Sequence, residues 1–171
     1  MLTLYNSIPA GFTLMPTIQK LEWMSVVPKA LAIGTTTTGW PGTMANPVAF
    51  VDSGGCPIFL SDPNGYIYDK TWPDSVTCPV WSSSSSNCTC TGTNVSLTLS
   101  GGTTSFNFEI DPSTMPPSVQ GLTGVFCEKN SYMMNQNGMN IGGISFLINQ
   151  VLIDYSTPQV GFSKLAVTEN D

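Results

Sequence analysis

The chain has 171 residues with 41% hydrophobic but only 9% charged residues, and it carries a net charge of −6 with five lysines, no arginine and no histidine. These counts exclude a His-based zinc site and any Ser-His-Asp or Cys-His nucleophile system within the chain. They also argue against nucleic-acid binding. The ionisable groups best suited to chemistry near neutral or acid pH are therefore carboxylates and thiols, and the isoelectric point of about 4.2 fits a protein that works in acid. The length predicts that residues 1–171 form one domain.

The first third of the chain predicts β-strands. Residues 10–33 alternate apolar and polar side chains with few helix formers, which predicts two or three strands. Residues 34–42 predict a loop. Residues 47–51 form an apolar run that predicts a buried strand ending at Asp52. The turn that follows, Ser53-Gly54-Gly55, can offer backbone N–H groups to this carboxylate, although Asp before Ser-Gly is also common in ordinary turns.

The middle of the chain combines short apolar segments, turns and one hairpin. The apolar residues 58–60 predict one helical turn, and residues 62–65 predict a turn because proline fixes φ and Asn-Gly accepts positive φ. The serines at 82–86 predict an exposed loop. Clean alternation at 94–99 and again at 106–110, around a Gly-Gly turn, predicts a β-hairpin.

The remaining segments add no long helix. Three prolines within 111–117 predict a rigid connection, and residues 124–127 predict a strand. Residues 132–135 predict a loop or a helical turn that serves packing or cleft lining, and nothing in the sequence suggests a cofactor. Because no long stretch keeps a helical period, the sequence predicts an all-β domain with short helical turns.

The cysteines and the glycosylation motifs both point to an oxidising compartment. Four of the five cysteines can form two disulfides, but their spacing alone does not fix the pairing; they are Cys56, Cys78, Cys88, Cys90 and Cys127. A metal site is the weaker interpretation, because no fourth ligand stands at zinc-finger spacing. Asn87-Cys88-Thr89 and Asn94-Val95-Ser96 are glycosylation sequons. We therefore expect a secreted or extracytoplasmic protein, with its signal peptide on a longer precursor and no membrane span.

The stretch from 139 to 162 is the most informative part of the sequence. It contains Asn140-Ile141-Gly142, then a strand-like run ending in Asp154, and then Val160-Gly161-Phe162. Together with Asp52-Ser53-Gly54 upstream, this pattern resembles the C-terminal lobe of the pepsin-like (family A1) aspartic peptidases. In that family a hydrophobic-hydrophobic-Gly element precedes a short helix, a strand ending in Asp, and Val-Gly-Phe. The resemblance covers about residues 12–168, and its spacings match without a gap.

The resemblance implies one lobe of the pepsin-like acid protease β-barrel fold and half of an active site. Each of two lobes gives one Asp, and the pair shares a proton and activates a water that attacks a peptide carbonyl at acid pH. Asp52 would be the catalytic carboxylate, Ser53 would bond across to the partner lobe, and Gly54 would donate its N–H to Asp52. The partner would be an N-terminal lobe on a separate chain or a second copy of this chain, and the substrate an extended peptide. The resemblance implies no cofactor and no metal, and it pairs Cys127 with Cys88 or Cys90.

Several positions depart from the family pattern. Gly55 stands where the family usually has Thr or Ser, whose hydroxyl bonds the catalytic carboxylate, and Cys56 and Gly143 are also unusual. Cys56 is better explained as a structural disulfide or a buried thiol than as a reactive one. Three other functions therefore stay open: a catalytically degenerate pepsin-fold binding or inhibitor protein, a homodimeric single-lobe peptidase in which two Asp52 residues meet, and an unrelated secreted β-sandwich with a solvated turn at Asp52.

Overall fold

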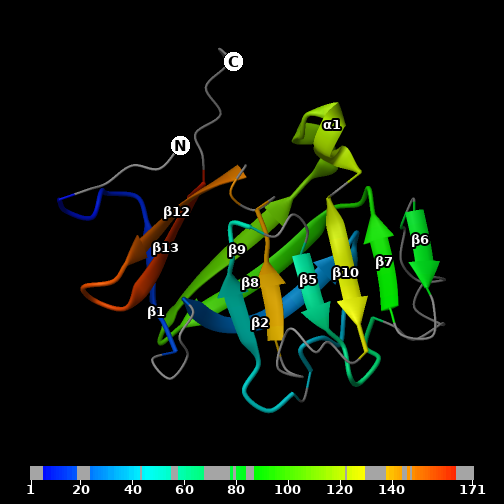
Figure 1. Cartoon of the computed structure of the whole chain (residues 1–171), viewed down its shortest axis with the longest axis horizontal. Coiled ribbons are helices and arrows are strands. Elements are labelled where there is room, and N and C mark those ends of the chain that lie inside the picture. Colours follow the sequence, from blue (N-terminus) through cyan, green and yellow to red (C-terminus); the bar gives the residue numbers. More distant parts are fainter. Residues whose placement is uncertain are drawn as a thin grey trace.

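The computed structural model describes residues 6–18, 24–42, 44–54, 58–67, 78, 80–83, 87–121, 123–129, 138–143, 146 and 148–164. The protein is mostly β, as the sequence predicts, and its strands form a small and a large sheet (Figure 1). The small sheet has the order β1-β13-β12, with β1 at Thr13–Pro16, β12 at Asn149–Asp154 and β13 at Gln159–Lys164.

The large sheet has the order β6-β7-β10-β5-β11-β4-β2-β8-β9, with β3 paired to β2. Its strands are β2 (Ser25–Ile33), β3 (Thr36–Thr37), β4 (Val48–Val51), β5 (Ile58–Ser61), β6 (Val80–Ser83), β7 (Asn87–Thr91), β8 (Val95–Gly101), β9 (Thr104–Ile110), β10 (Gly124–Glu128) and β11 (Gly138–Ile141). Among the described strands no pairing joins β6 to β9, so the large sheet is not closed into a barrel.

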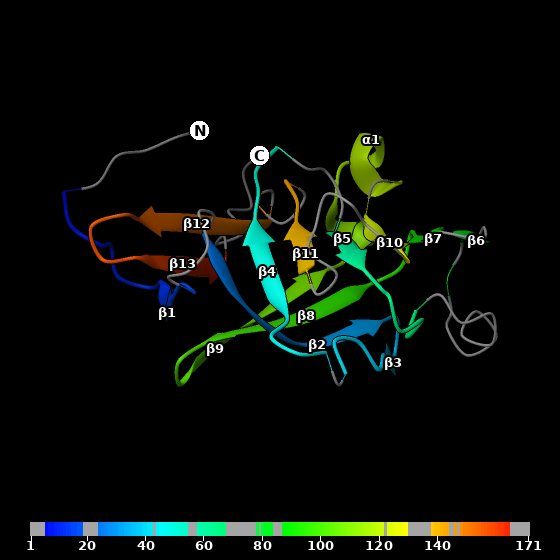
Figure 2. The same ribbon diagram turned by 60° about the horizontal axis from the view of Figure 1, so that its bottom comes forward.

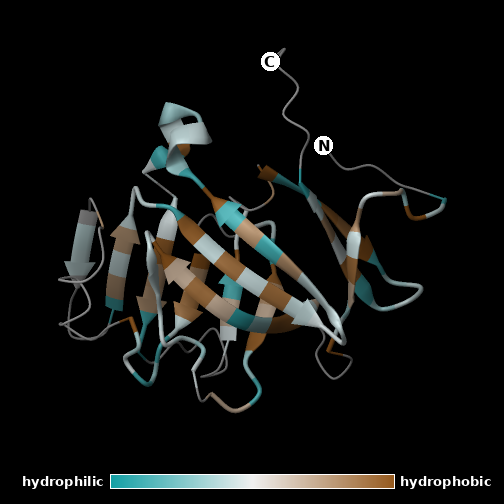
Figure 3. Ribbon diagram, turned by 180° about the vertical axis from the view of Figure 1, so that it is seen from behind, coloured by the Kyte–Doolittle hydropathy of each residue, from teal (hydrophilic) through white to brown (hydrophobic). Residues whose placement is uncertain are grey.

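The hairpin of β8 and β9 forms as its alternation predicts. Val95 pairs with Ile110 and Gly101 with Thr104, and Gly102 in the turn takes a φ of 58°. Val95, Leu97 and Leu99 are buried, whereas the polar residues between them face outward. Figure 3 shows this change between hydrophobic and hydrophilic residues along the strands.

An aromatic cluster packs the small sheet against this hairpin. The ring of Phe162 on β13 lies 4.7 Å from that of Phe108 and 5.4 Å from that of Phe106, both on β9. Next to it in the Val-Gly-Phe sequence, Gly161 pairs with Leu14 on β1, and a Cβ at Gly161 would lie 2.9 Å from Leu14 Cδ2. The glycine therefore leaves room for the Leu14 side chain between β1 and β13.

Three local expectations were wrong. Residues 58–61 form strand β5 rather than a helical turn, because they are buried between β11 and β10. The loop expected at 34–42 contains the short strand β3. Two serines of the expected exposed loop, Ser82 and Ser83, belong to β6, and residues 84–86 lie outside the described part. The rigid connection expected at 111–117 contains a 3-10 helix at Pro112–Thr114 and leads into helix α1 at Pro117–Gln120, an expectation that these elements do not contradict.

Two disulfides involve strand β7, one linking it to β10 and one to Cys78, which precedes β6. Cys88 on β7 pairs with Cys127 on β10, where the two residues are register partners with Cα atoms 5.0 Å apart. Cys78 is bonded to Cys90, with a Cα separation of 5.9 Å. Cys56 lies outside the described residues, as do residues 132–135. No helix in the described part of the chain is both long and apolar enough to cross a membrane. Two disulfides are typical of proteins from oxidising compartments.

Strand β11 lies between β4 and β5, although β4 and β5 follow each other in the sequence. It runs parallel to β4 and antiparallel to β5, so Gly138 to Ile141 pair with Val48 to Val51 in order. Figure 2 shows β4 and β11 side by side and pointing the same way. As a result, the ends of β4 and β11 meet at the same edge of the sheet, where Asp52 follows β4.

Candidate active site

Main-chain hydrogen bonds on both sides of β4 fix the position of Asp52. Val51 donates its N–H to the carbonyl of Met24 at 3.1 Å, and Asp52 donates its own to the carbonyl of Ile141 at 3.2 Å. Because alternate residues of a strand face the same side, the side chain of Asp52 continues the row of Phe50. The carboxylate of Asp52 therefore lies on the face of the sheet to which the side chain of Phe50 points.

The two carboxylate oxygens of Asp52 each accept one hydrogen bond. Oδ1 accepts from the backbone N–H of Gly54 at 2.8 Å, and Oδ2 accepts from Nδ2 of Asn140 at 2.7 Å. Asp52 is half-buried, so it keeps contact with solvent while its orientation is set by two donors. A carboxylate held in this way has a fixed orientation and keeps part of its surface in contact with solvent.

Asn140 reaches Asp52 because of the register between β4 and β11. It pairs with Phe50, two residues before Asp52, and so lies on the same face as the carboxylate. Its Oδ1 is buried and has no hydrogen-bond partner among the described residues. The sequence placed Asn140 only within the hydrophobic-Gly element and missed its contact with Asp52. The available signal was an amide side chain where the resemblance implies isoleucine.

The other residues of the expected site fall into two groups. Ser53 and Gly54 are exposed at the turn, and the Ser53 hydroxyl makes no hydrogen bond within the described segments. Ile141 and Gly142 are buried where β11 ends, and Ile141 accepts the Asp52 N–H. Gly55 lies outside the described residues, so the effect of its missing hydroxyl stays a prediction.

Asp154 belongs to a different structural unit, the tight turn between β12 and β13. Its Oδ1 accepts from the Ser156 hydroxyl at 2.6 Å, the Ser156 N–H at 2.9 Å and the Thr157 N–H at 3.2 Å. Its Oδ2 accepts from Nε2 of Gln159 at 2.9 Å. These bonds, with the Ser156 hydroxyl contributing most and then Gln159, lower the pKa of Asp154 from 3.8 to about 2. Asp154 is therefore a structural carboxylate that stays ionised in acid.

We expect Asp154→Asn to change the stability of the protein in a pH-dependent way. Since folding lowers the pKa of Asp154, its ionised form stabilises the fold fully above about pH 4, and this contribution is lost as the pH falls towards 2. Urea unfolding midpoints at several pH values test this. The variant should be less stable than the native chain at pH 5–6, and the two should converge near pH 2. A difference that stays constant over this range would contradict the assignment.

A second carboxylate with a structural role, that of Asp62, is buried. Asp62 follows β5, is fully buried, and accepts the backbone N–H groups of Tyr66 at 2.8 Å and Ile67 at 2.7 Å. The main-chain N–H of Gly65 bonds the carbonyl of Asp62 at 3.0 Å, and Gly65 takes a φ of 70°. The turn predicted at 62–65 is confirmed, but its buried carboxylate was not predicted. In the described segments, no three His, Cys, Asp or Glu side chains gather as metal ligands would.

Comparison with models of known protein families finds no match to the sequence, and comparison with curated proteins finds none either.

Proposed function

We propose that the chain is the C-terminal lobe of a secreted, pepsin-type aspartic endopeptidase in which Asp52 supplies one of two catalytic carboxylates. The observation that carries this proposal is the position of Asp52 at the shared edge of β4 and β11, with its oxygens held by Gly54 and Asn140. The stretch that contains Asp52 and the stretch from 139 to 162 carry the resemblance, and the hydrogen bond between Asp52 and Asn140 joins them across 88 residues of sequence. Their meeting supports the proposal that they form one half of an active site.

The order of strands supports the same proposal. A strand that lies between two strands consecutive in the chain, as β11 does between β4 and β5, forms a psi-shaped motif. The later signature is compatible with it, because Phe146 donates its N–H to the carbonyl of Gly143, β12 ends at Asp154, and a tight turn leads into β13. An unrelated sandwich with a solvated Asp52 turn gives no reason for these two stretches to meet.

The proposed chemistry needs a second carboxylate. Two carboxylates in close contact cannot both ionise, so one acts as base on a water while the other keeps its proton and acts as acid. This chain offers one such group, and the second would come from an N-terminal lobe or from another copy of the chain. An extended peptide would lie across the shared edge, held by main-chain hydrogen bonds. Acid pH would favour the singly protonated pair.

Native mass spectrometry of the protein isolated from its source, combined with cleavage of denatured protein at acid pH, tests the proposal. A complex with a different chain that carries an Asp-Thr/Ser-Gly motif, together with cleavage, would support a two-chain enzyme. A mass of twice this chain with cleavage would support a symmetric dimer with paired Asp52 residues. A complete two-lobe assembly that fails to cleave would overturn the catalytic proposal and favour a pepsin-fold binding protein.

Asn140 donates a side-chain hydrogen bond to the Asp52 carboxylate. Gly55 has no hydroxyl and cannot supply such a side-chain donor. We therefore expect Asn140→Leu, a change of similar shape, to lower kcat of the assembled enzyme by about 10- to 100-fold, the range of one hydrogen bond to a charged group. The stability of the chain should be unchanged or raised, because the buried and unpartnered Oδ1 disappears with the amide.

Rescue distinguishes an orienting role from a structural one. Adding Gly55→Thr to the Asn140→Leu variant should restore part of kcat, because the resemblance implies that a hydroxyl at position 55 donates to the catalytic carboxylate. Steady-state kinetics and urea unfolding of the same samples measure both effects. A fall in activity that follows a fall in the free energy of unfolding would count against the orienting role of Asn140.

A further inference from the structure

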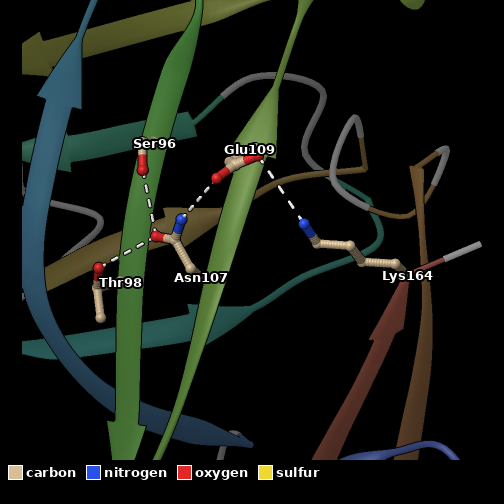
Figure 4. A network of polar contacts seen from close by, with 5 residues as sticks. All are labelled: Ser96, Thr98, Asn107, Glu109 and Lys164. Carbon is tan, nitrogen blue, oxygen red and sulfur yellow. Dashed lines mark hydrogen bonds and ion pairs between the residues drawn. The ribbon is translucent and has the colours of Figure 1, made fainter. Parts of the chain in front are cut away.

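The outer face of the β8–β9 hairpin is polar along its length and has no part in the proposed site. Ser96 and Thr98 on β8 donate hydrogen bonds to Oδ1 of Asn107 on β9, at 3.2 and 3.1 Å. Asn107 donates to Glu109 at 3.0 Å, and Glu109 is paired with Lys164 of β13 at 3.8 Å (Figure 4). This face, here called the hairpin polar face, presents hydroxyl, amide and carboxylate groups to solvent.

Asn94 extends this face at the start of β8. The residue after it, Val95, is buried, so the strand's alternation places Asn94 on the same side as Ser96 and Thr98. The main-chain carbonyl of Asn94 accepts the N–H of Gly34 at 2.8 Å, which anchors its backbone. Its side chain is exposed and makes no hydrogen bond within the described part of the chain. The amide nitrogen is therefore free to carry a substituent without loss of a native contact.

We propose that Asn94 carries an N-linked oligosaccharide that lies over the hairpin polar face. Asn94-Val95-Ser96 is a complete acceptor sequon. The two disulfides are typical of the oxidising compartments in which such transfer takes place. In the reaction, Nδ2 of Asn94 forms a bond to the anomeric carbon of a lipid diphosphate-linked oligosaccharide. The bond from that carbon to the diphosphate breaks, the lipid diphosphate leaves, and the amide loses one proton.

The charge of the chain gives the glycan a physical role. Only 9% of the residues are charged, and the isoelectric point is about 4.2. In moderately acid solution the net charge therefore approaches zero, where repulsion between molecules is weakest and association is favoured. A neutral oligosaccharide stays hydrated at every pH. The oligosaccharide would therefore keep the protein molecules apart near the isoelectric point, where charge repulsion between them is weakest.

Secretion of the full chain from a eukaryotic cell line, followed by mass spectrometry, tests the proposal. An amidase that cleaves the Asn–sugar bond in H₂¹⁸O should lower the mass by one glycan and leave ¹⁸O-labelled Asp at position 94. This measurement uses the unaltered chain and so does not depend on whether a variant folds. Unlabelled Asn94 in every secreted molecule would overturn the proposal.

Matched variants separate the two sequons. Asn94→Gln should remove the glycan at this site, whereas Asn87→Gln, which removes only the other sequon, should leave it in place. Ser96→Thr keeps the acceptor hydroxyl and should keep the glycan. Loss of all glycan in Asn87→Gln alone would contradict the assignment to Asn94. Light scattering near pH 4 should rise after enzymatic release of the glycan, and an unchanged signal would remove the proposed role in solubility.

Discussion

Asp52→Asn is expected to abolish peptide cleavage by the assembled two-lobe enzyme while the chain keeps its fold. The substitution removes the carboxylate that would exchange a proton with the attacking water, and general acid–base groups of this kind contribute about 10²- to 10⁴-fold to a rate. The loss should appear in kcat, since the amide keeps the shape of the side chain. Cleavage of a peptide or of denatured protein at acid pH measures it. Retained turnover would remove Asp52 from the mechanism.

The geometry around Asp52 explains why this variant should fold. The Oδ1 atom of the new amide can still accept the Gly54 N–H. The amino group of the new amide side chain faces Asn140. The amide of Asn140 can rotate by 180°, so that its Oδ1, which has no partner among the described residues of the native chain, accepts a hydrogen bond from that amino group. Asp111→Asn is the matched control, because Asp111 is a partly exposed carboxylate that caps the 3-10 helix through Ser113. That variant should cleave like the native enzyme.

Local sequence patterns were enough to predict the strand that ends at Asp52, the β8–β9 hairpin and the turn at 62–65. Each depends on an apolar run, on alternation or on turn chemistry within about ten residues. Strand β5 was missed because the apolar run at 58–60 has only three residues, too few to show a period that separates strand from helix. Only its burial between β10 and β11 decides.

The contact between Asp52 and Asn140 depends on a different kind of information. It joins residues 88 positions apart and exists only because β11 pairs with β4 in parallel and in one register. A shift of that register by one residue would turn Asn140 to the opposite face. The sequence alone therefore placed both residues in the candidate site without giving the hydrogen bond between them.

The largest expected effect on stability comes from Asp62→Ala. The Asp62 carboxylate is fully buried and holds the N–H groups of Tyr66 and Ile67 at 2.8 and 2.7 Å. Removing it leaves both donors without that acceptor, and each unsatisfied buried donor costs about 1–3 kcal/mol, so the free energy of unfolding should fall by roughly 2–6 kcal/mol. Urea unfolding near pH 6 measures this. Asp111→Ala is the matched control: it removes a similar cap at a more exposed site and should lower the free energy of unfolding much less.

The surroundings of Asp62 explain why this loss should spread beyond one turn. The turn holds Tyr66 against the loop at 39–42, where a Cβ on Gly39 would lie 2.6 Å from the Tyr66 ring. The strand before it is tied to the same loop, since Nε1 of the buried Trp40 donates to the carbonyl of Ser61 at 3.0 Å. Asp62 also donates its main-chain N–H to Glu128 of β10 at 2.8 Å, a bond that alanine keeps. Asp62 acts on packing rather than on Asp52. An assembled Asp62→Ala enzyme that is still folded should therefore cleave at the native rate. A loss of kcat at temperatures well below its unfolding temperature would show that this turn also supports the site.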